Sequence, residues 1–277
     1  MMNETIGIIG FGNMGQAIAA RLKADYKIFV FDKDRNKTRN LIEINVADNI
    51  ADLLKQVKTV ILAVKPQDFD TVLEEIKNYA ADKLIISIAA GITTVYIEKS
   101  LGEAKVIRVM PNMPARLGKG VTCLCKGRFA SREDLNFTQK IFDYLGKTLI
   151  LKEEMMDAAT AISGSGPGYY FYRVENNPRE YKNNPDKFLK NFIEDLKGAA
   201  LTLGFSEEEA GLLSSATGTA SDFMLAQTQL PAAQLKQQVA SKGGTTEAAL
   251  EVLKRNGSLK EAVQAAYARA KQLAKRS

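Results

Sequence analysis

Short apolar runs and amphipathic stretches alternate along the first half of the chain. Apolar runs rich in β-branched residues are typical of buried strands, and they occur at residues 5–9, 27–32, 59–64, 84–89 and 105–110. Stretches with apolar residues at helical spacing lie between them, at 13–23, 68–79 and 93–101. This alternation predicts a parallel sheet with helices on both faces. Two further strands and an intervening helix are expected to extend the sheet, at 120–126, 147–152 and 131–145.

The second half has a different pattern. Strand signals stop near Glu153, and helical patterns follow, including a stretch of small residues at 214–227 and an amphipathic helix at 259–275. These helices offer several apolar faces and little core of their own, which predicts an all-α domain that completes its core against a partner. A monomeric bundle is the alternative. The predicted domains are therefore residues 1–152 and 153–277.

Composition removes several kinds of chemistry. The chain contains no histidine, which excludes the commonest general acid–base and zinc ligand. Cys123 and Cys125 lie on one expected strand, and the sequence has no second cysteine pair that could complete a zinc site. They are therefore interpreted as packing thiols, and no metal site is expected. Two cysteines and no signal-peptide pattern predict a reducing, cytoplasmic location. No apolar run reaches membrane-spanning length, so no membrane partner is expected.

The net charge of +6 changes the picture little. Basic and acidic residues are interleaved over most of the chain, without a basic stripe or aromatic platforms. Nucleic acid is therefore not an expected partner. A weakly basic surface still favours small anionic molecules.

A glycine motif follows the first expected strand directly. Gly10, Gly12 and Gly15 have the GxGxxG spacing, and the strand at 27–32 ends in Asp32. In such motifs one glycine permits the tight turn, one lets backbone approach a pyrophosphate, and one lets the helix pack on the strand. The pattern predicts a dinucleotide-binding, Rossmann-like doubly wound sheet, followed by the all-α domain. A glycine-rich turn in another α/β unit is the alternative.

The end of the second strand carries opposing signals about the dinucleotide. Asp32 could accept hydrogen bonds from a ribose 2′-hydroxyl, which slightly favours NADH, whereas Lys33 and Arg35 could attract the 2′-phosphate of NADPH. A solvated charged turn would leave the choice open.

Two further kinds of segment are candidates for ligand binding. Loops at 63–67, 89–92 and 110–114 follow expected strands, where ligands of doubly wound sheets bind, although each could be only a turn. The segment "ASKGGTTEAAL" at 240–250 gathers small and hydroxylated residues before a helix. It could be a simple cap or a seat for an anion, because a helix start presents free N–H groups and positive potential.

Together these segments resemble the pyrroline-5-carboxylate reductase family. The resemblance runs nearly end to end and rests on "GFGNMG", "AVKPQ", "RVMPNMPARLGKGVT", "SGSGPGYY" and "VASKGGTTEAAL", in that order. It implies a Rossmann domain, then a helical dimerisation domain that interleaves with that of a second chain, with dimers that can join into rings. The implied reaction is reduction of 1-pyrroline-5-carboxylate to L-proline by NADPH or NADH.

The resemblance also implies site residues. The family's cofactor-binding positions correspond to Gly10, Phe11, Gly12, Asn13, Met14, Gly15, Asp32, Lys33, Asn49, Ala63, Val64, Lys65, Pro66, Met110, Pro111 and Asn112. Its substrate loop corresponds to Ser241, Gly243, Gly244, Thr245 and Thr246, which would hold the substrate carboxylate. Thr246 is expected to contact the ring nitrogen as the catalytic residue.

This reaction suits a chain without histidine. A cyclic imine can be protonated in solution, and its iminium carbon then accepts hydride without a dedicated proton donor. The protein's task is then mainly alignment, which in favourable cases supplies roughly 7–11 kcal/mol of a barrier.

Two departures from the family pattern stand out. Lys242 replaces the usual proline, which frees the backbone and adds a cation beside the expected carboxylate seat, or is a neutral surface change. Residues 171–187 interrupt what is one helix in the family. Pro178, Pro185 and four asparagines there predict an inserted loop, as a lid, an altered partner surface or an inert excursion.

Two other functions remain as alternatives. A 3-hydroxyacid dehydrogenase-like enzyme would share the N-terminal half, but the lysine of that family's "GxxGxGxxxK" segment is missing from "SGSGPGYY". Another imine reductase is also conceivable. A non-catalytic dinucleotide-binding regulator would be supported by the insertion and by Lys242, and opposed by Ser241, Thr245 and Thr246.

Overall fold

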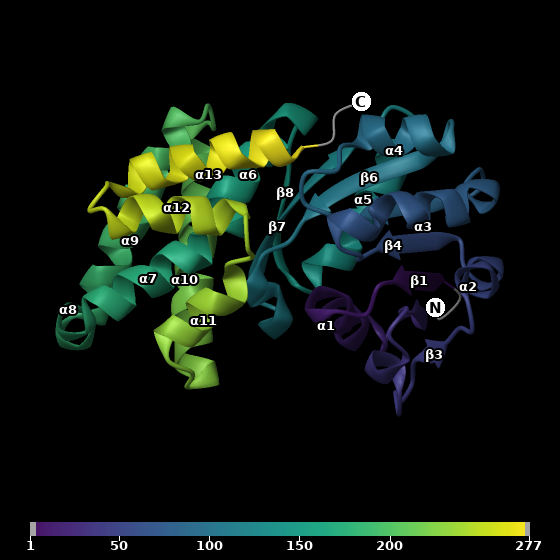
Figure 1. Ribbon diagram of the computed structural model, residues 1–277, viewed down its shortest axis with the longest axis horizontal. Helices are drawn as coiled ribbons and strands as arrows, with labels where there is room; N and C mark the ends of the chain where they lie inside the picture. Colours follow the sequence, from purple (N-terminus) through teal and green to yellow (C-terminus); the bar gives the residue numbers. More distant parts are fainter. Residues whose placement is uncertain (1–3, 275–277) are drawn as a thin grey trace. The chain divides into compact units, whose positions relative to one another are not determined.

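The computed structural model describes residues 4–274, which form two compact units (Figure 1). One unit contains residues 4–110, 123–153 and 274, and the other contains residues 111–122 and 154–273. The division of the chain at residue 152 stays a prediction, because the first unit includes a segment that returns after residue 122.

The first unit is built on one eight-stranded sheet with the strand order β3-β2-β1-β4-β5-β6-β7-β8. The strands are β1 Thr5–Ile9, β2 Lys27–Phe31, β3 Asn45–Val46, β4 Thr59–Leu62, β5 Leu84–Ser87, β6 Lys105–Met110, β7 Gly120–Lys126 and β8 Gly146–Ile150. Strands β1 to β6 pair in parallel, whereas β7 runs antiparallel to β6. The expected parallel sheet and its extension by two later strands are confirmed.

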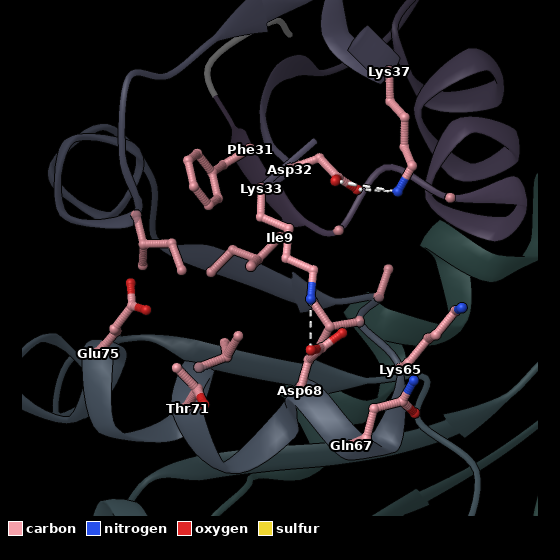
Figure 2. A pocket seen from close by; sticks show the side chains of 16 residues that line it. Ile9, Phe31, Asp32, Lys33, Lys37, Lys65, Gln67, Asp68, Thr71 and Glu75 are labelled. Carbon is pink, nitrogen blue, oxygen red and sulfur yellow. Dashed lines mark hydrogen bonds and ion pairs between the residues drawn. The ribbon is translucent and has the colours of Figure 1, made fainter. Parts of the chain in front are cut away.

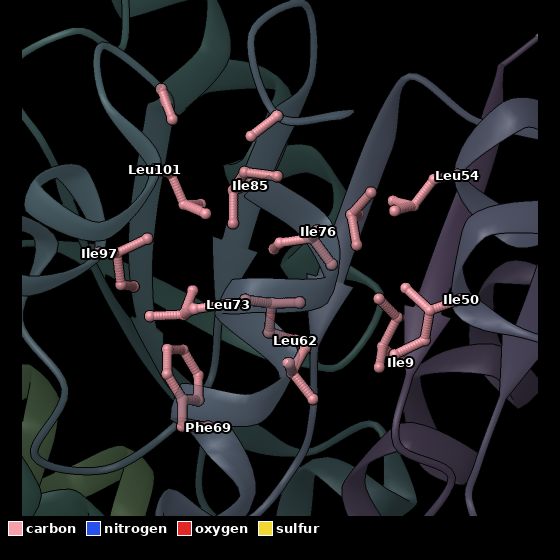
Figure 3. Packing of buried hydrophobic residues seen from close by; sticks show 14 of the residues in the cluster. Ile9, Ile50, Leu54, Leu62, Phe69, Leu73, Ile76, Ile85, Ile97 and Leu101 are labelled. Carbon is pink, nitrogen blue, oxygen red and sulfur yellow. The ribbon is translucent and has the colours of Figure 1, made fainter. Parts of the chain in front are cut away.

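Helices cover both faces of this sheet. Helices α2 Ile50–Gln56, α3 Phe69–Ile76 and α4 Thr94–Leu101 pack on one face, where Leu54, Phe69 and Ile97 meet strand side chains such as Leu62 and Ile85 (Figure 3). Alternate strand residues point to the other face. There lie α1 Asn13–Leu22 and α5 Arg132–Asp143, and the ring of Tyr26, in the turn after α1, meets the ring of Phe137 of α5 edge to face at 6.4 Å. The doubly wound prediction is therefore confirmed.

Local capping explains where several of these helices begin. Ser131 and Asp134 form a reciprocal capping box at α5, and the Thr93 side chain accepts the N–H of Tyr96 at α4. Short 3-10 turns complete the unit, as η1 Arg35–Thr38, η2 Pro66–Asp68 and η3 Lys77–Tyr79, and a further turn, η5 Glu153–Met155, begins at the end of its last strand segment and continues into the second unit. The second of these turns begins at a proline, whose missing N–H is not needed at a helix start.

The second unit is helical. It contains η4 Met113–Leu117, α6 Met156–Ala159, the π-helical turn Thr160–Gly164, α7 Gly166–Asn176, α8 Pro178–Asn183, α9 Pro185–Thr202, α10 Glu207–Thr228, α11 Ala232–Val239, α12 Thr245–Lys254 and α13 Leu259–Leu273. The small residues of α10 bring it close to α9, because a Cβ at Gly218 would lie 2.7 Å from Ile193 Cγ1. The expected all-α second half is confirmed.

The prediction of a loop at residues 171–187 is wrong. The segment is helical except at its junctions, because α7 continues to Asn176, α8 follows, and α9 begins at Pro185. Both prolines occupy the first helical position, where they are tolerated, and Asn184 caps α9 by accepting the N–H of Lys187. The residues read as helix breakers therefore act as helix starts.

Cys123 and Cys125 are both buried thiols. Cys125 donates its S–H to a carboxylate oxygen of Glu153 at 3.4 Å, and burial raises the pKa of this thiol far above its ordinary value. Both properties agree with a packing role. Within residues 4–274, no helix is long and apolar enough to cross a bilayer.

Candidate active site

The glycine motif has the geometry that a dinucleotide requires. Gly10 has a φ of +96°, and a Cβ there would lie 2.6 Å from the Ala63 carbonyl oxygen. A Cβ at Gly15 would collide with the Gly10 carbonyl, so α1 packs tightly on the turn. A Cβ at Gly12 would meet no atom within 4 Å, which leaves open space at the start of α1. The motif therefore leaves room for a pyrophosphate where the helix dipole favours one.

Asp32 joins the end of β2 to the glycine turn. Its carboxylate accepts the backbone N–H groups of Phe11 at 2.6 Å and Asp34 at 2.8 Å, and Lys37 Nζ lies 3.2 Å from both oxygens. Burial by itself would raise the pKa of Asp32, but these backbone bonds and Lys37 outweigh it and lower the pKa. Asp32 is thus an anion neutralised by Lys37.

A pocket of about 560 Å³ opens beside Asp32 and the glycine turn (Figure 2). Of the expected cofactor-binding residues, the pocket is lined by Gly10, Gly12, Asp32, Lys33, Ala63, Val64 and Lys65. The sequence reasoning did not name several other lining residues, among them Phe31, Lys37, Ile50, Asp68 and Thr71. Lys33 reaches across the pocket to Asp68, where Nζ lies 2.6 Å from a carboxylate oxygen.

The other expected cofactor residues do not line this pocket. Phe11 is buried beneath the turn, whereas Asn13 and Pro66 are exposed and Met14 and Met110 are half-buried. Asn49 caps α2, with its side chain bonded to the backbone N–H and carboxylate of Asp52, both at 2.8 Å. A ribose contact from Asn49 would have to share its side chain with that cap.

Pro111 and Asn112 belong to the helical unit, where Asn112 is 2% exposed. The Asn112 amide donates to the Ser163 carbonyl at 3.2 Å, and its oxygen accepts the Val121 N–H at 3.0 Å. This residue ties the segment 111–122 to the π-helical turn, so its side chain has a structural task in addition to the one expected of it.

The hydroxylated segment ends at the start of α12. Gly244 is the N-cap, and a Cβ there would collide with the Ser241 side chain, so glycine allows this tight loop. The backbone N–H groups of Thr245, Thr246 and Glu247 form the first helical turn, which has no partners within the helix. The loop thus presents donors and positive potential, as the anion-seat interpretation requires.

The expected substrate residues differ in exposure and in bonding. Ser241 and Gly243 are exposed, Thr245 is half-buried, and Thr246 is buried. The Gly243 N–H is taken by the Glu247 carboxylate at 2.6 Å, and the Gly244 N–H by the Ser241 carbonyl at 2.9 Å. These two N–H groups hold the loop, which leaves the first turn of α12 to meet an anion.

Three residues near this loop were missed by the sequence reasoning. Ser165 Oγ lies 2.9 Å from Thr245 Oγ1 and accepts the hydroxyl of Thr246 at 3.0 Å. Arg269, on α13, donates from Nε to the Gly243 carbonyl at 2.8 Å, and Glu247 holds the same glycine by its N–H. The "SGSGPGYY" segment contains Ser165, but no spacing links residues 165 and 246, and a lone arginine on a terminal helix carries no signal.

Comparison with protein families covers both units. Residues 5–91 match the family described as NADP oxidoreductase coenzyme F420-dependent, and residues 188–273 match pyrroline-5-carboxylate reductase dimerisation. The first match covers the glycine motif, and the second covers α10 to α13 and the hydroxylated loop.

Relatives of known name match over nearly the whole chain. A pyrroline-5-carboxylate reductase of Mycobacterium leprae is 33% identical, over 97% of this chain and 96% of the relative. One of Synechocystis is 32% identical, over 99% of this chain and all of the relative.

Solved structures agree with these relatives. The NADP-bound pyrroline carboxylate reductase of Plasmodium falciparum has a TM-score of 0.65 at 29% identity, covering 99% of this chain and 100% of that one. The Coxiella burnetii pyrroline-5-carboxylate reductase has a TM-score of 0.64 at 32% identity, covering 98% of each chain.

Proposed function

The chain belongs to the pyrroline-5-carboxylate reductase family, and on this premise we propose that it reduces 1-pyrroline-5-carboxylate to L-proline with a hydride from NAD(P)H. The observation that carries the proposal is the pairing of two features in one chain. One is a glycine turn with open space at Gly12, and the other is a hydroxylated loop that starts α12 with free N–H donors. A dinucleotide and a small carboxylate are the ligands that these features suit.

The proposed cofactor residues divide by the part of the dinucleotide that they meet. Gly10, Phe11, Gly12, Asn13, Met14 and Gly15 hold the pyrophosphate; Asp32, Lys33 and Asn49 lie at the adenosine ribose; and Ala63, Val64, Lys65, Pro66, Met110, Pro111 and Asn112 border the nicotinamide. The open space at Gly12 and the exposed start of α1 support the first assignment. When bound, the reduced nicotinamide supplies the hydride.

Cofactor preference depends on the pairing of Asp32 with Lys37. The Asp32 carboxylate favours ribose hydroxyls and repels a 2′-phosphate, whereas Lys37 and Arg35 attract that phosphate. Lys37 neutralises Asp32 through two contacts of 3.2 Å, and its side chain is 41% exposed. We therefore expect both reduced cofactors to support turnover, with NADH somewhat favoured because Lys37 can turn to solvent and Asp32 cannot.

In the proposed reaction the chain's residues orient the substrate. The first turn of α12, with Ser241 and Thr245, holds the carboxylate, and Thr246 Oγ1 meets the ring nitrogen. Protonation of the imine in solution leaves an electrophilic carbon, so the site needs no histidine, and the chain has none. Orientation and neutralisation of the carboxylate are the contributions that this geometry can make.

We also propose that the functional assembly is a homodimer, with rings of dimers as a larger form. The match of residues 188–273 to a dimerisation model supports an oligomer. The helices of that region carry exposed apolar side chains at Leu201 and Leu273, which are 36% and 44% exposed.

Turnover tests the proposed function. Purified protein is mixed with 1-pyrroline-5-carboxylate and NADH or NADPH, and loss of reduced-nicotinamide absorbance is followed together with proline formation. Proline formed in step with cofactor oxidation is the expected result. Tight dinucleotide binding without any turnover would contradict it and favour the non-catalytic regulator, and turnover of a different cyclic imine alone would correct the substrate.

A further inference from the structure

A π-helical turn places Ser165 beside the hydroxylated loop. It follows the π-helical turn Thr160–Gly164, and its own N–H donates to the Thr160 carbonyl at 2.9 Å, five residues back. Such wide turns are rare and concentrate at functional sites. The side chain is only 1% exposed, and it faces Thr245 and Thr246 across 80 and 81 residues of sequence.

The hydrogen bonds around Ser165 determine the direction of the Thr246 hydroxyl. Thr246 has one hydroxyl proton, and it donates that proton to Ser165 Oγ at 3.0 Å. Ser165 can pass its own proton to Thr245 Oγ1 at 2.9 Å or to Tyr169, whose own O–H donates to the Ala161 carbonyl at 3.0 Å. Toward any other group, Thr246 Oγ1 can then only accept.

The surroundings hold Thr246 in this direction. Thr246 is 4% exposed, and a Cβ at Gly168 would lie 2.5 Å from its Cγ2, so the side chain is packed against the backbone of α7. A buried hydroxyl that lost its partner would carry a desolvation penalty, which favours keeping the bond to Ser165.

We propose that Ser165 is a positioning residue that fixes Thr246 as a hydrogen-bond acceptor toward the substrate ring, so that the site selects rings whose nitrogen carries a proton. The inference rests on the proposed function, because it concerns the same site. It assigns the protonated imine as the form that is bound, and it explains how a site without an acid can favour that form. Ser165 itself does not touch the substrate.

The test uses inhibitors that differ only in the ring atom. L-Proline carries a protonated ring nitrogen, whereas tetrahydro-2-furoate carries an oxygen that can only accept. In Ser165→Ala, Thr246 is free to turn its proton toward the ring. The furoate is expected to bind more tightly, so that its inhibition constant falls about five- to tenfold relative to that of proline. At the same time kcat/KM for the imine falls about tenfold.

Matched variants separate positioning from packing. Ser221→Ala removes another fully buried hydroxyl of the same unit, bonded to the Thr217 carbonyl at 2.7 Å, and should leave the inhibitor ratio unchanged. Thr246→Ser keeps the hydroxyl and should keep the wild-type ratio. In a Thr246→Val background, Ser165→Ala should cost nothing further, because Ser165 acts through Thr246.

The outcomes distinguish this inference from the proposed function. An active wild type in which Ser165→Ala leaves the inhibitor ratio unchanged, or adds fully to Thr246→Val, overturns the role of Ser165 alone. A wild type that binds dinucleotide but neither turns over the imine nor binds proline overturns the proposed function, and the inference with it. Each variant is expected to keep the wild-type NADH affinity and to lose no more than the few degrees of unfolding temperature that one buried hydrogen bond is worth, which verifies that the fold is intact.

Discussion

At the residue scale, the ion pair of Asp32 and Lys37 is the contact that a change of cofactor would affect most. The carboxylate oxygens of Asp32 accept two backbone N–H groups as well as Lys37, so their capacity is filled. A ribose hydroxyl or a 2′-phosphate must therefore compete with Lys37 or recruit it. The lysine, rather than the aspartate alone, is the residue that can respond.

Removing Lys37 should shift the preference toward NADH. In Lys37→Ala the unpaired Asp32 carboxylate repels a 2′-phosphate and is free to bind a ribose hydroxyl, and a charge-assisted bond is worth about 1.5–3 kcal/mol. The ratio of kcat/KM for NADPH to that for NADH is expected to fall roughly tenfold or more in steady-state assays. Lys27→Ala, at the opposite end of β2, is the control. An unchanged ratio would remove Lys37 from cofactor recognition.

At the element scale, Tyr181 links the short helix α8 to α10 and α9. Tyr181 donates to Asp222 of α10 at 2.8 Å, and Tyr170 of α7 donates to the same oxygen at 2.7 Å. Burial, and then the Asp222 carboxylate, raise the pKa of Tyr181 to about 12, so it remains a donor at all ordinary pH values. The Tyr181 ring also packs edge to face on Phe188, with 5.5 Å between centroids.

The Tyr181 hydroxyl should contribute measurably to stability. Tyr181→Phe keeps the ring contact and removes the bond to Asp222, at a cost of about 1 kcal/mol. The unfolding temperature is expected to fall by roughly 2–4 °C in calorimetry, with little effect on kcat. Tyr172→Phe, which keeps its ring beneath Lys236, is the matched control. Equal unfolding temperatures for the two variants would mean that α8 is held by packing alone.

Elements with a strong local signal could be predicted from the sequence, and the others could not. The β-branched runs that became β1, β4, β5 and β6 are buried on both faces of the sheet, so their apolar character marks them clearly. Pro178 and Pro185 wrongly predict a loop, because a proline at a helix start and one in a loop look alike without the neighbouring helices. Ser165 and Thr246 meet across 81 residues, a contact that only the packing of α7 against α12 creates.

At the scale of the whole molecule, the two units divide the proposed reaction between them. The sheet unit contains the glycine turn and its pocket, and the helical unit contains the hydroxylated loop, Ser165 and Arg269. The dinucleotide-binding motif could be predicted from the sequence because its glycines lie close together along the chain. The assignment of the loop depended on resemblance, because hydroxyl groups before a helix are equally typical of a simple cap. The cytoplasmic location stays a prediction.

For the whole molecule we predict assembly into a dimer or a multiple of dimers. Light scattering on the purified protein is expected to give twice the mass of one chain, or an even multiple of it. The physical reason is that the helical unit, which matches a dimerisation model, gains a buried apolar interface from a second copy. A single-chain mass at micromolar concentration, together with full activity, would show that the dimer is not needed.

Transfer of deuterium from the cofactor to proline would show the proposed hydride transfer itself. NADH or NADPH carrying deuterium on the transferred position of the nicotinamide is incubated with protein and 1-pyrroline-5-carboxylate, and the product is analysed by mass spectrometry. L-Proline heavier by one deuterium, located on the former imine carbon, is the expected product. Unlabelled proline, or consumption of cofactor without any proline, would contradict the proposed transfer.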